Sequence, residues 1–203
     1  MFYNEAATKA NFMREANSFP VVHLATHAVS NTNDPGSSYI SFYPADTAGG
    51  KLYLEELYGI EMDSASLVII SACESGDGQL VNSEGVISLT RGFAYAGCKS
   101  MVTSLWKAND RSTAIIIQKF HAYLQQGYAK SEALQKAKLD YIKAETVHKT
   151  PNYWAHLVLI GDTEPLIETS KSKNGMWMLA GLVLLIAGGV WLGKRKKRKS
   201  TLS

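Results

Sequence analysis

The sequence predicts a layered α/β fold with a mainly parallel sheet. Four short apolar runs, rich in β-branched residues, have the length and composition of buried strands, at 21–26, 67–72, 99–106 and 153–160. Segments with helical spacing of apolar residues separate most of these runs. Strands that alternate with helices form parallel βαβ units, so we expect one layered α/β domain with about four main strands.

The N-terminal part alternates between helix and strand. Residues 2–17 space their apolar side chains as one face of a helix does, and the segment Ser18-Phe-Pro20 ends the pattern. The strand at 21–26 then runs into a turn-rich loop at 30–38. Two short elements complete this part, a strand or hairpin arm at 39–43 and a helix at 52–58.

The remaining helices lie between the later strands. One spans 84–96 and ends at Gly97, the next is capped by Asn109 or Asp110 and ends at Gly127, and Ser131 caps another. The apolar residues expected on their buried faces are Val86, Leu89, Phe93, Ala96, Ile116, Phe120, Tyr123, Leu134, Ala137 and Tyr141.

Charge and cysteine content exclude some classes of protein. Six of the 21 Lys and Arg residues lie at 194–199, and without them the remaining chain carries more acidic than basic residues. A nucleic-acid-binding face is therefore not indicated. Two cysteines, Cys73 and Cys98, are too few for a disulfide framework, and Cys98 is expected to pack at a helix–strand junction.

A membrane-spanning helix is predicted at residues 175–193. These 19 residues carry no charge, and as a helix they are long enough for the roughly 30 Å hydrocarbon core of a bilayer. The basic tail at 194–203 follows at once, which places the C-terminus on the cytoplasmic side and favours contact with anionic lipid. No secretory signal is present to explain export of the domain, so the side on which it lies stays open. Residues 166–174 are predicted to be a linker.

Two side chains at strand ends form a candidate catalytic dyad. His27 ends the run that begins at Val21, and Cys73 directly follows the run that begins at Leu67. Adjacent parallel strands lie ~5 Å apart, and their carboxyl ends meet at one edge of the sheet. An imidazole near a thiol favours the thiolate, which is the nucleophilic form.

Other chemistries fit these residues less well. His23 and His27 resemble an HxxxH pair, but four residues along a strand span roughly 13 Å, too far for one zinc ion. No metal or cofactor is therefore expected, and His23 is expected to be a hydrogen-bonded core residue. A flavodoxin-like ligand-binding domain is disfavoured because no glycine-rich phosphate loop follows the first strand.

Several motifs together resemble one family. The segments LATHA at 24–28, LVIISACESG at 67–76, EGV at 84–86, SLW at 104–106 and YWA at 153–155 resemble the CHAT domain, a caspase-like, separase-related peptidase module. The resemblance covers about residues 1–165 and implies a caspase-like layered α-β-α fold. The family's usual pattern has glycine where Ala28 stands and threonine where Ser75 stands.

The resemblance implies a role for each site residue. Cys73 attacks the scissile carbonyl, His27 handles the proton, and the backbone N–H groups of Ala28 and Cys73 bind the oxyanion. Ala28 in place of glycine leaves a backbone donor but not a glycine-only conformation. Asp110, Trp106 and Glu74 are candidates for the substrate pocket, although Asp110 fits a helix cap equally well and Glu74 a solvated loop acid.

Two functions remain open after this comparison. A complete CHAT domain is longer and often follows tetratricopeptide repeats, so N-terminal strands are expected to be missing from the sheet. The first hypothesis is a membrane-anchored cysteine endopeptidase that cleaves a protein partner in signalling or defence. The alternative is a catalytically inactive fragment that acts as a protein-interaction module.

Overall fold

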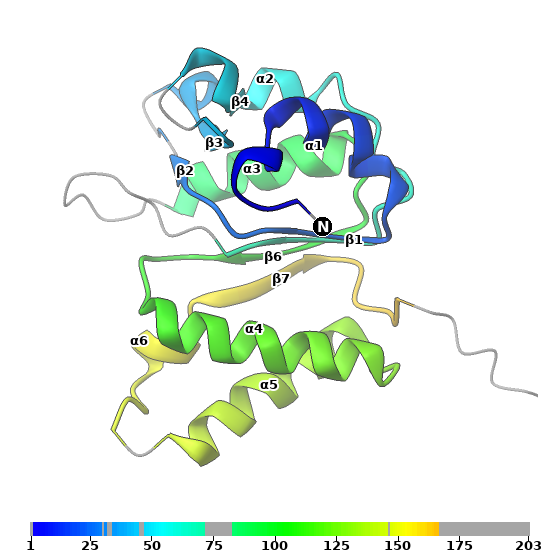
Figure 1. The fold of residues 1–203 in the computed structure, drawn as a ribbon. Helices are drawn as coiled ribbons and strands as arrows, with labels where there is room; N and C mark the ends of the chain where they lie inside the picture. Colours follow the sequence, from blue (N-terminus) through cyan, green and yellow to red (C-terminus); the bar gives the residue numbers. More distant parts are fainter. Residues whose placement is uncertain are drawn as a thin grey trace, which may run out of the picture. The chain divides into compact units, whose positions relative to one another are not determined.

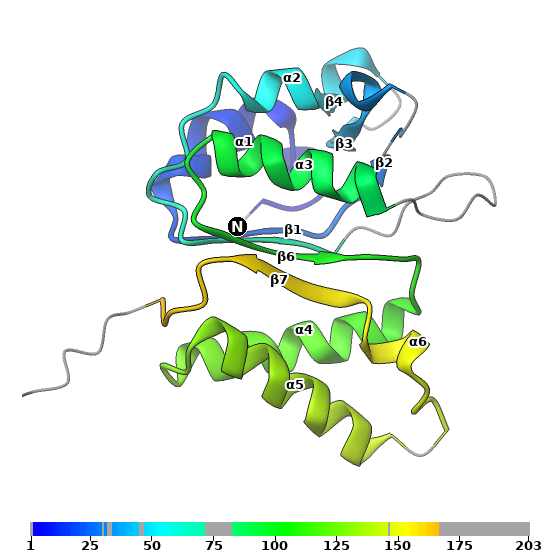
Figure 2. The ribbon, with the colours of Figure 1, turned by 180° about the vertical axis from the view of Figure 1, so that it is seen from behind.

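The computed structural model describes residues 2–29, 31, 34–44, 47–71, 83–145 and 147–166. These residues belong to one compact unit, Met1–Ile167. Figure 1 shows a sheet between two layers of helices, and Figure 2 shows the same layers from behind. The layered α/β arrangement with a mainly parallel sheet agrees with the caspase-like fold that the resemblance implied.

The central sheet has the strand order β1-β5-β6-β7. Strand β1 pairs in parallel with β5, and β5 pairs in parallel with β6, while β7 runs antiparallel to β6. Among the described residues, β5 is the only neighbour of β1, which therefore lies at an edge of the sheet. The strands span Val21–Leu24 (β1), Leu67–Ile70 (β5), Ser100–Ser104 (β6) and Leu157–Gly161 (β7).

A smaller antiparallel sheet lies on the side of the central sheet that carries α1, α2 and α3 (Figure 1). It joins Ala28–Val29 (β2), Tyr39–Ser41 (β3) and Lys51–Tyr53 (β4). Ile40 and Leu52 are fully buried in this sheet. The segment after β1 therefore leaves the central sheet at once and enters this second sheet.

Helices cover both faces of the central sheet. Those on one side are Lys9–Glu15 (α1), Leu54–Leu57 (α2) and Ser83–Tyr95 (α3), and those on the other are Asp110–Gln125 (α4), Lys130–Ala144 (α5) and Pro151–Trp154 (α6). Four 3₁₀ turns are also described, at Asn4–Ala6, Ala16–Ser18, Pro35–Ser37 and Ala48–Gly50.

The strands supply apolar residues to a core on each face. Val68 and Ile70 pack toward α2 and α3, whereas Leu67 and Ile69 pack toward α4 and α5. This alternation follows from the strand geometry, because successive side chains point to opposite faces. Of the residues predicted on buried helix faces, the following are buried: Leu89, Phe93, Ala96, Ile116, Phe120, Leu134, Ala137 and Tyr141.

The prediction for the last strand was partly wrong. Residues 153–154 lie in α6, which begins at Pro151, and β7 begins only at Leu157. Proline favours the first turn of a helix because its missing N–H has no partner there in any case. Strand β7 is antiparallel to β6 because two consecutive helices, α4 and α5, connect the two strands. The second helix returns the chain to the end of the sheet at which β6 ends, and β7 begins there.

Two local predictions also need correction, for 52–58 and for Ser131, and the structure decides between the two candidate caps of α4. Residues 52–58 are not one helix, because β4 occupies the first part and α2 is a single turn. Asn109, not Asp110, caps α4, since its side chain accepts a hydrogen bond from the Ser112 N–H at 3.2 Å. Ser131 lies inside α5, whose N-cap residue is Ala129 without a side-chain cap.

Apart from Leu166, the first residue of the predicted linker, the linker, the membrane helix and the basic tail lie outside the described residues. In the described part of the chain, no helix is both long and apolar enough to cross a bilayer.

Candidate functional site

The carboxyl ends of β1 and β5 lie side by side. Leu24 pairs with Ile70 in the parallel register, and the Ser71 N–H donates to the Leu24 carbonyl at 3.2 Å. His27 and Cys73 each follow this pair by three residues along the chain. The segments that carry the two predicted catalytic residues therefore leave the sheet from neighbouring strands at the same edge.

His27 is exposed in the short connection between β1 and β2. Its carbonyl accepts a hydrogen bond from the Ser41 N–H at 2.8 Å, and the hydroxyl of Thr26 donates to the Ser41 carbonyl at 2.5 Å. Both bonds attach this connection to β3. These hydrogen bonds therefore fix the backbone around His27, while the His27 side chain is exposed to solvent.

Ala28 is buried and pairs with Ile40 in the small sheet. Its backbone does not have a positive φ, since Asn4 is the only described non-glycine residue that does. The alanine therefore occupies a conformation open to any L-residue, and the strand pairing of this segment does not need a glycine at this position.

Cys73 and Glu74 lie outside the described residues, within the segment 72–82. The predicted contact between Cys73 and His27 and the predicted oxyanion donor at Cys73 thus stay predictions. Ser71 is the last described residue before this segment.

A pocket of about 360 Å³ lies between the sheet and α4. On the sheet side it is formed by His23, Ala25 and Ser71, which share the face of Leu67 and Ile69 by alternation along the strands. The residues that line it from α4 are Asp110, Thr113, Ala114, Ile117, Gln118 and His121.

Two histidines and a serine form a hydrogen-bonded cluster in this pocket. His23 Nε2 lies 2.9 Å from the Ser71 hydroxyl, and His23 Nδ1 lies 3.4 Å from His121 Nε2. The two imidazole rings are 5.3 Å apart between centroids. His23 makes the hydrogen bond expected of it but is not a core residue, because β1 lies at the edge of the sheet and leaves His23 exposed.

The cluster disfavours protonation of its imidazoles. Desolvation, followed by the neighbouring His121, lowers the pKa of His23 to about 4, and desolvation also lowers the pKa of His121. Water at the exposed side of His23 screens the charge of the protonated ring. The lowered pKa of His23 therefore corresponds to a smaller change in the free energy of unfolding than its value alone implies. Both rings are neutral at neutral pH.

The sequence analysis did not identify His121 as a site residue. The only sequence signal is its position four residues after Ile117 in a helix, which places both on one face. His121 is 98 residues from His23, so only the packing of α4 against β1 brings them together.

The two other candidate pocket residues that are described have different surroundings. Asp110 lines the pocket from the first turn of α4. Trp106 is not among the residues that line it, and its Nε1–H donates to the Asn152 carbonyl at 3.3 Å while its ring contacts His156. Trp106 therefore attaches the end of β6 to α6.

Cys98 is a packing residue, as predicted. It is buried, its thiol donates to the Ser100 carbonyl at 3.2 Å, and desolvation raises its pKa. A buried thiol with a raised pKa is a poor nucleophile. Cys73 is the only other cysteine in the chain.

Comparison with known proteins identifies relatives of this chain. The family model of the CHAT domain matches residues 1–162. Tetratricopeptide repeat protein 28 of Homo sapiens is 27% identical over 197 aligned residues, which cover 81% of this chain and 8% of that protein. The protein of the same name from Mus musculus is 28% identical over 108 residues, 53% of this chain and 4% of that protein. The chain thus spans less than a tenth of the length of these relatives.

Proposed function

This chain belongs to the CHAT domain family, a family of caspase-like, peptidase-related modules, and we propose that it is a cysteine endopeptidase with a Cys73–His27 dyad. One observation carries the proposal, the parallel pairing of Leu24 with Ile70. Because His27 and Cys73 follow these two residues by equal distances along the chain, the sheet register supports their meeting beyond the same edge.

The proposed reaction follows from the chemistry of the two side chains. His27 takes the thiol proton of Cys73, and the thiolate attacks the carbonyl carbon of a peptide bond. Backbone N–H groups at Ala28 and Cys73 stabilise the resulting oxyanion. His27 then gives the proton to the leaving amine, and water releases the acyl group from sulfur. Alanine at position 28 keeps the backbone N–H group that this scheme requires.

Substrate choice is a further part of the proposal. We expect Asp110 to bind a basic side chain of the substrate, since Asp110 carries the only formal negative charge among the residues that line the described pocket. Glu74 and Trp106 are the remaining candidates for substrate contacts, and the position of Trp106 outside that pocket weakens its case. Cleavage of peptides with arginine before the cut, lost in Asp110→Asn, is the expected result.

The relatives favour a second candidate function. Both are tetratricopeptide repeat proteins by name, and such repeats form extended surfaces that bind other proteins. A catalytically inactive CHAT module that binds a protein partner, or that works with an upstream repeat domain, is therefore the alternative.

We also propose that residues 175–193 anchor the protein in a membrane as a single helix, with the basic tail on the cytoplasmic side. The support is the run of 19 uncharged residues followed by six basic ones. Extraction of membranes with alkaline carbonate tests this proposal. The full chain is expected to stay in the membrane pellet, and its release into the supernatant would contradict the anchor.

Thiol alkylation distinguishes an active dyad from an inactive module. In the full chain with Cys98→Ser, Cys73 is the only thiol, so its rate of reaction with iodoacetamide can be followed against pH. An ordinary thiol reacts with a midpoint near pH ~8.5. We expect a midpoint well below this value, and a return to about 8.5 in His27→Ala.

His148→Ala is the matched control, because His148 is also exposed but lies just before α6, where its ring contacts Tyr153. This variant should alkylate as the parent does. A midpoint near ~8.5 in the parent, unaffected by His27→Ala, would exclude the active dyad and favour the interaction module.

A further inference from the structure

His23 and His121 are two imidazoles that the proposed peptidase reaction does not use. They come from β1 and from α4, on opposite sides of the pocket described above. Their nearest nitrogens, His23 Nδ1 and His121 Nε2, are 3.4 Å apart.

This separation is long for a hydrogen bond and suitable for two metal ligands. Hydrogen bonds from N–H groups have their mode near ~2.9–3.0 Å and become weak beyond about 3.2 Å. Two nitrogens bound to one zinc ion at ~2.0–2.1 Å and at the tetrahedral angle lie about 3.3 Å apart. The distance between the two nitrogens therefore fits one ion to within about a tenth of an ångström, and a rotation of the two rings by about 35° directs both lone pairs at it.

The other ring nitrogen of His23 has the partner that a metal-binding histidine requires. His23 Nε2 lies 2.9 Å from the Ser71 hydroxyl, and donation from Nε2–H leaves the Nδ1 lone pair directed at His121. Histidine ligands commonly donate their second N–H to a neighbouring oxygen, which fixes the tautomer and the ring orientation. His121 has only to carry its proton on Nδ1, so that Nε2 is also free to bind.

The charges that line the pocket do not oppose a cation. Asp110 is the only pocket residue with a formal charge at neutral pH, and no lysine or arginine lines the pocket. Neutral imidazoles are the form that binds metal, and the lowered pKa values keep both rings in that form. The volume of about 360 Å³ leaves room for water molecules on the ion.

We propose that His23 Nδ1 and His121 Nε2 bind one zinc-class divalent transition-metal ion, with Ser71 as the outer partner of His23. In the described part of the chain, no group of three or more His, Cys, Asp or Glu residues is arranged to hold a metal. The ion therefore keeps open positions for water or for a donor atom from a bound molecule. It links the edge strand β1 to α4 next to the carboxyl ends of β1 and β5.

Calorimetric titration with zinc chloride tests the site in the full chain carrying Cys73→Ser and Cys98→Ser, which removes competing thiols and is independent of the proposed dyad. We expect saturable binding of one Zn²⁺ and no binding of Mg²⁺, which prefers oxygen ligands. At a hundredfold excess over Kd, Zn²⁺ should raise the Tm by about 5–10 °C.

Variants identify the ligands. His23→Gln and His121→Gln should each abolish saturable binding, and Ser71→Ala should weaken it about tenfold. His148→Gln is the control and should bind as the parent does. Histidine ring NMR spectra of the parent provide a test that needs no variant to fold, because only the His23 and His121 signals should shift at one equivalent. The proposal would be overturned if the parent failed to bind Zn²⁺. It would also be overturned if His23→Gln and His121→Gln both bound Zn²⁺ as tightly as the parent does.

Discussion

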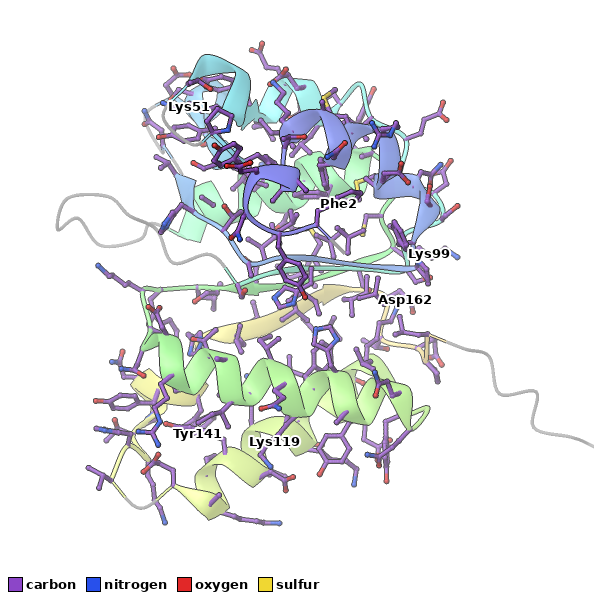
Figure 3. The ribbon with its side chains drawn as sticks, viewed as in Figure 1. Phe2, Lys51, Lys99, Lys119, Tyr141 and Asp162 are labelled. Atoms are coloured by element: carbon purple, nitrogen blue, oxygen red, sulfur yellow. The ribbon has the colours of Figure 1, made fainter. Side chains whose placement is uncertain are left out.

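The Nζ atom of Lys130 lies 3.0 Å from Oδ2 of Asp162, although the lysine side chain is only 1% exposed and the aspartate side chain is 39% exposed. Lys130 also donates to the Ser66 carbonyl at 3.3 Å, and the Asp162 N–H donates to the Lys99 carbonyl at 2.9 Å. This ion pair joins the start of α5 to the end of β7. Figure 3 shows Asp162 and Lys99 at the same end of the sheet.

The two sides of this ion pair should respond differently to mutation. Asp162→Asn leaves the buried ammonium of Lys130 without its counter-charge, whereas Lys130→Met leaves a carboxylate that water can reach. We expect Asp162→Asn to lower the free energy of unfolding by about 2 kcal/mol, and Lys130→Met by no more than about 1 kcal/mol. Urea unfolding measures both values. A larger loss in the lysine variant would contradict the view that the unpaired ammonium is the more costly of the two.

His156 should make stability depend on pH. It is fully buried, its Nε2 lies 3.0 Å from the Thr113 hydroxyl, and its Nδ1 has no hydrogen-bond partner among the described residues. Desolvation, followed by Lys138, lowers the pKa of His156 to about 4. The unfolded chain, with a histidine pKa of about 6.5, then binds more protons than the folded chain between these two values.

The free energy of unfolding should therefore fall as the pH is lowered from about 6.5 to about 4, by up to about 3 kcal/mol from His156 alone. His156→Gln removes the titrating group and should show a smaller fall over that window. The pKa values of His23 and His121 are also lowered, so these residues also reduce the free energy of unfolding as the pH falls. The contribution of His156 is therefore the difference between the pH profiles of the variant and the parent. Parallel pH profiles for the two proteins would exclude His156 as a cause.

Gly97 is required by the backbone after α3. Its φ is +100°, and the N–H groups of Gly97 and Cys98 donate to the carbonyls of Ala94 and Phe93, as in a Schellman C-cap. A Cβ here would also collide with the carboxylate of Asp63. Gly97→Ala is expected to cost at least about 2 kcal/mol of stability, measured by urea unfolding.

Gly59→Ala is the control for that substitution. Gly59 has no positive φ, and a Cβ there would meet its nearest neighbour, the Glu56 carbonyl, at 3.6 Å. This change should be neutral or should stabilise the protein by about 0.5 kcal/mol. Equal effects at the two glycines would mean that the cap geometry does not constrain Gly97.

Cys98 should stay unreactive until the protein unfolds. Burial raises the pKa of its thiol and keeps the thiol protonated and inaccessible. In a Cys73→Ser variant, a thiol reagent should therefore find no reactive group in buffer and one in denaturant. Rapid reaction in buffer would show that the segment between α3 and β6 opens locally.

Local patterns in the sequence predicted most elements because they depend on near neighbours. The run 67–72 contains β5, and the spacing of Leu89, Phe93 and Ala96 placed their buried face correctly. The end of α3 at Gly97 was also predicted, since a left-handed C-cap favours glycine. The sequence did not decide between Asn109 and Asp110 as the N-cap of α4, because both residue types favour that position. A helix that begins one residue later would be capped by Asp110 instead.

For the candidate site, the sequence predicted where the residues lie relative to the strands but not which side chains are in contact. The sequence alone indicated that His27 and Cys73 follow two apolar strands, and this holds for the paired ends of β1 and β5. The antiparallel direction of β7, the cluster of His23, Ser71 and His121, and the pair of Lys130 and Asp162 were decided only by the tertiary structure. Hydrophobic periodicity and turn residues act over a few neighbouring positions, whereas these contacts join residues from 32 to 98 positions apart and depend on how whole helices pack on the sheet.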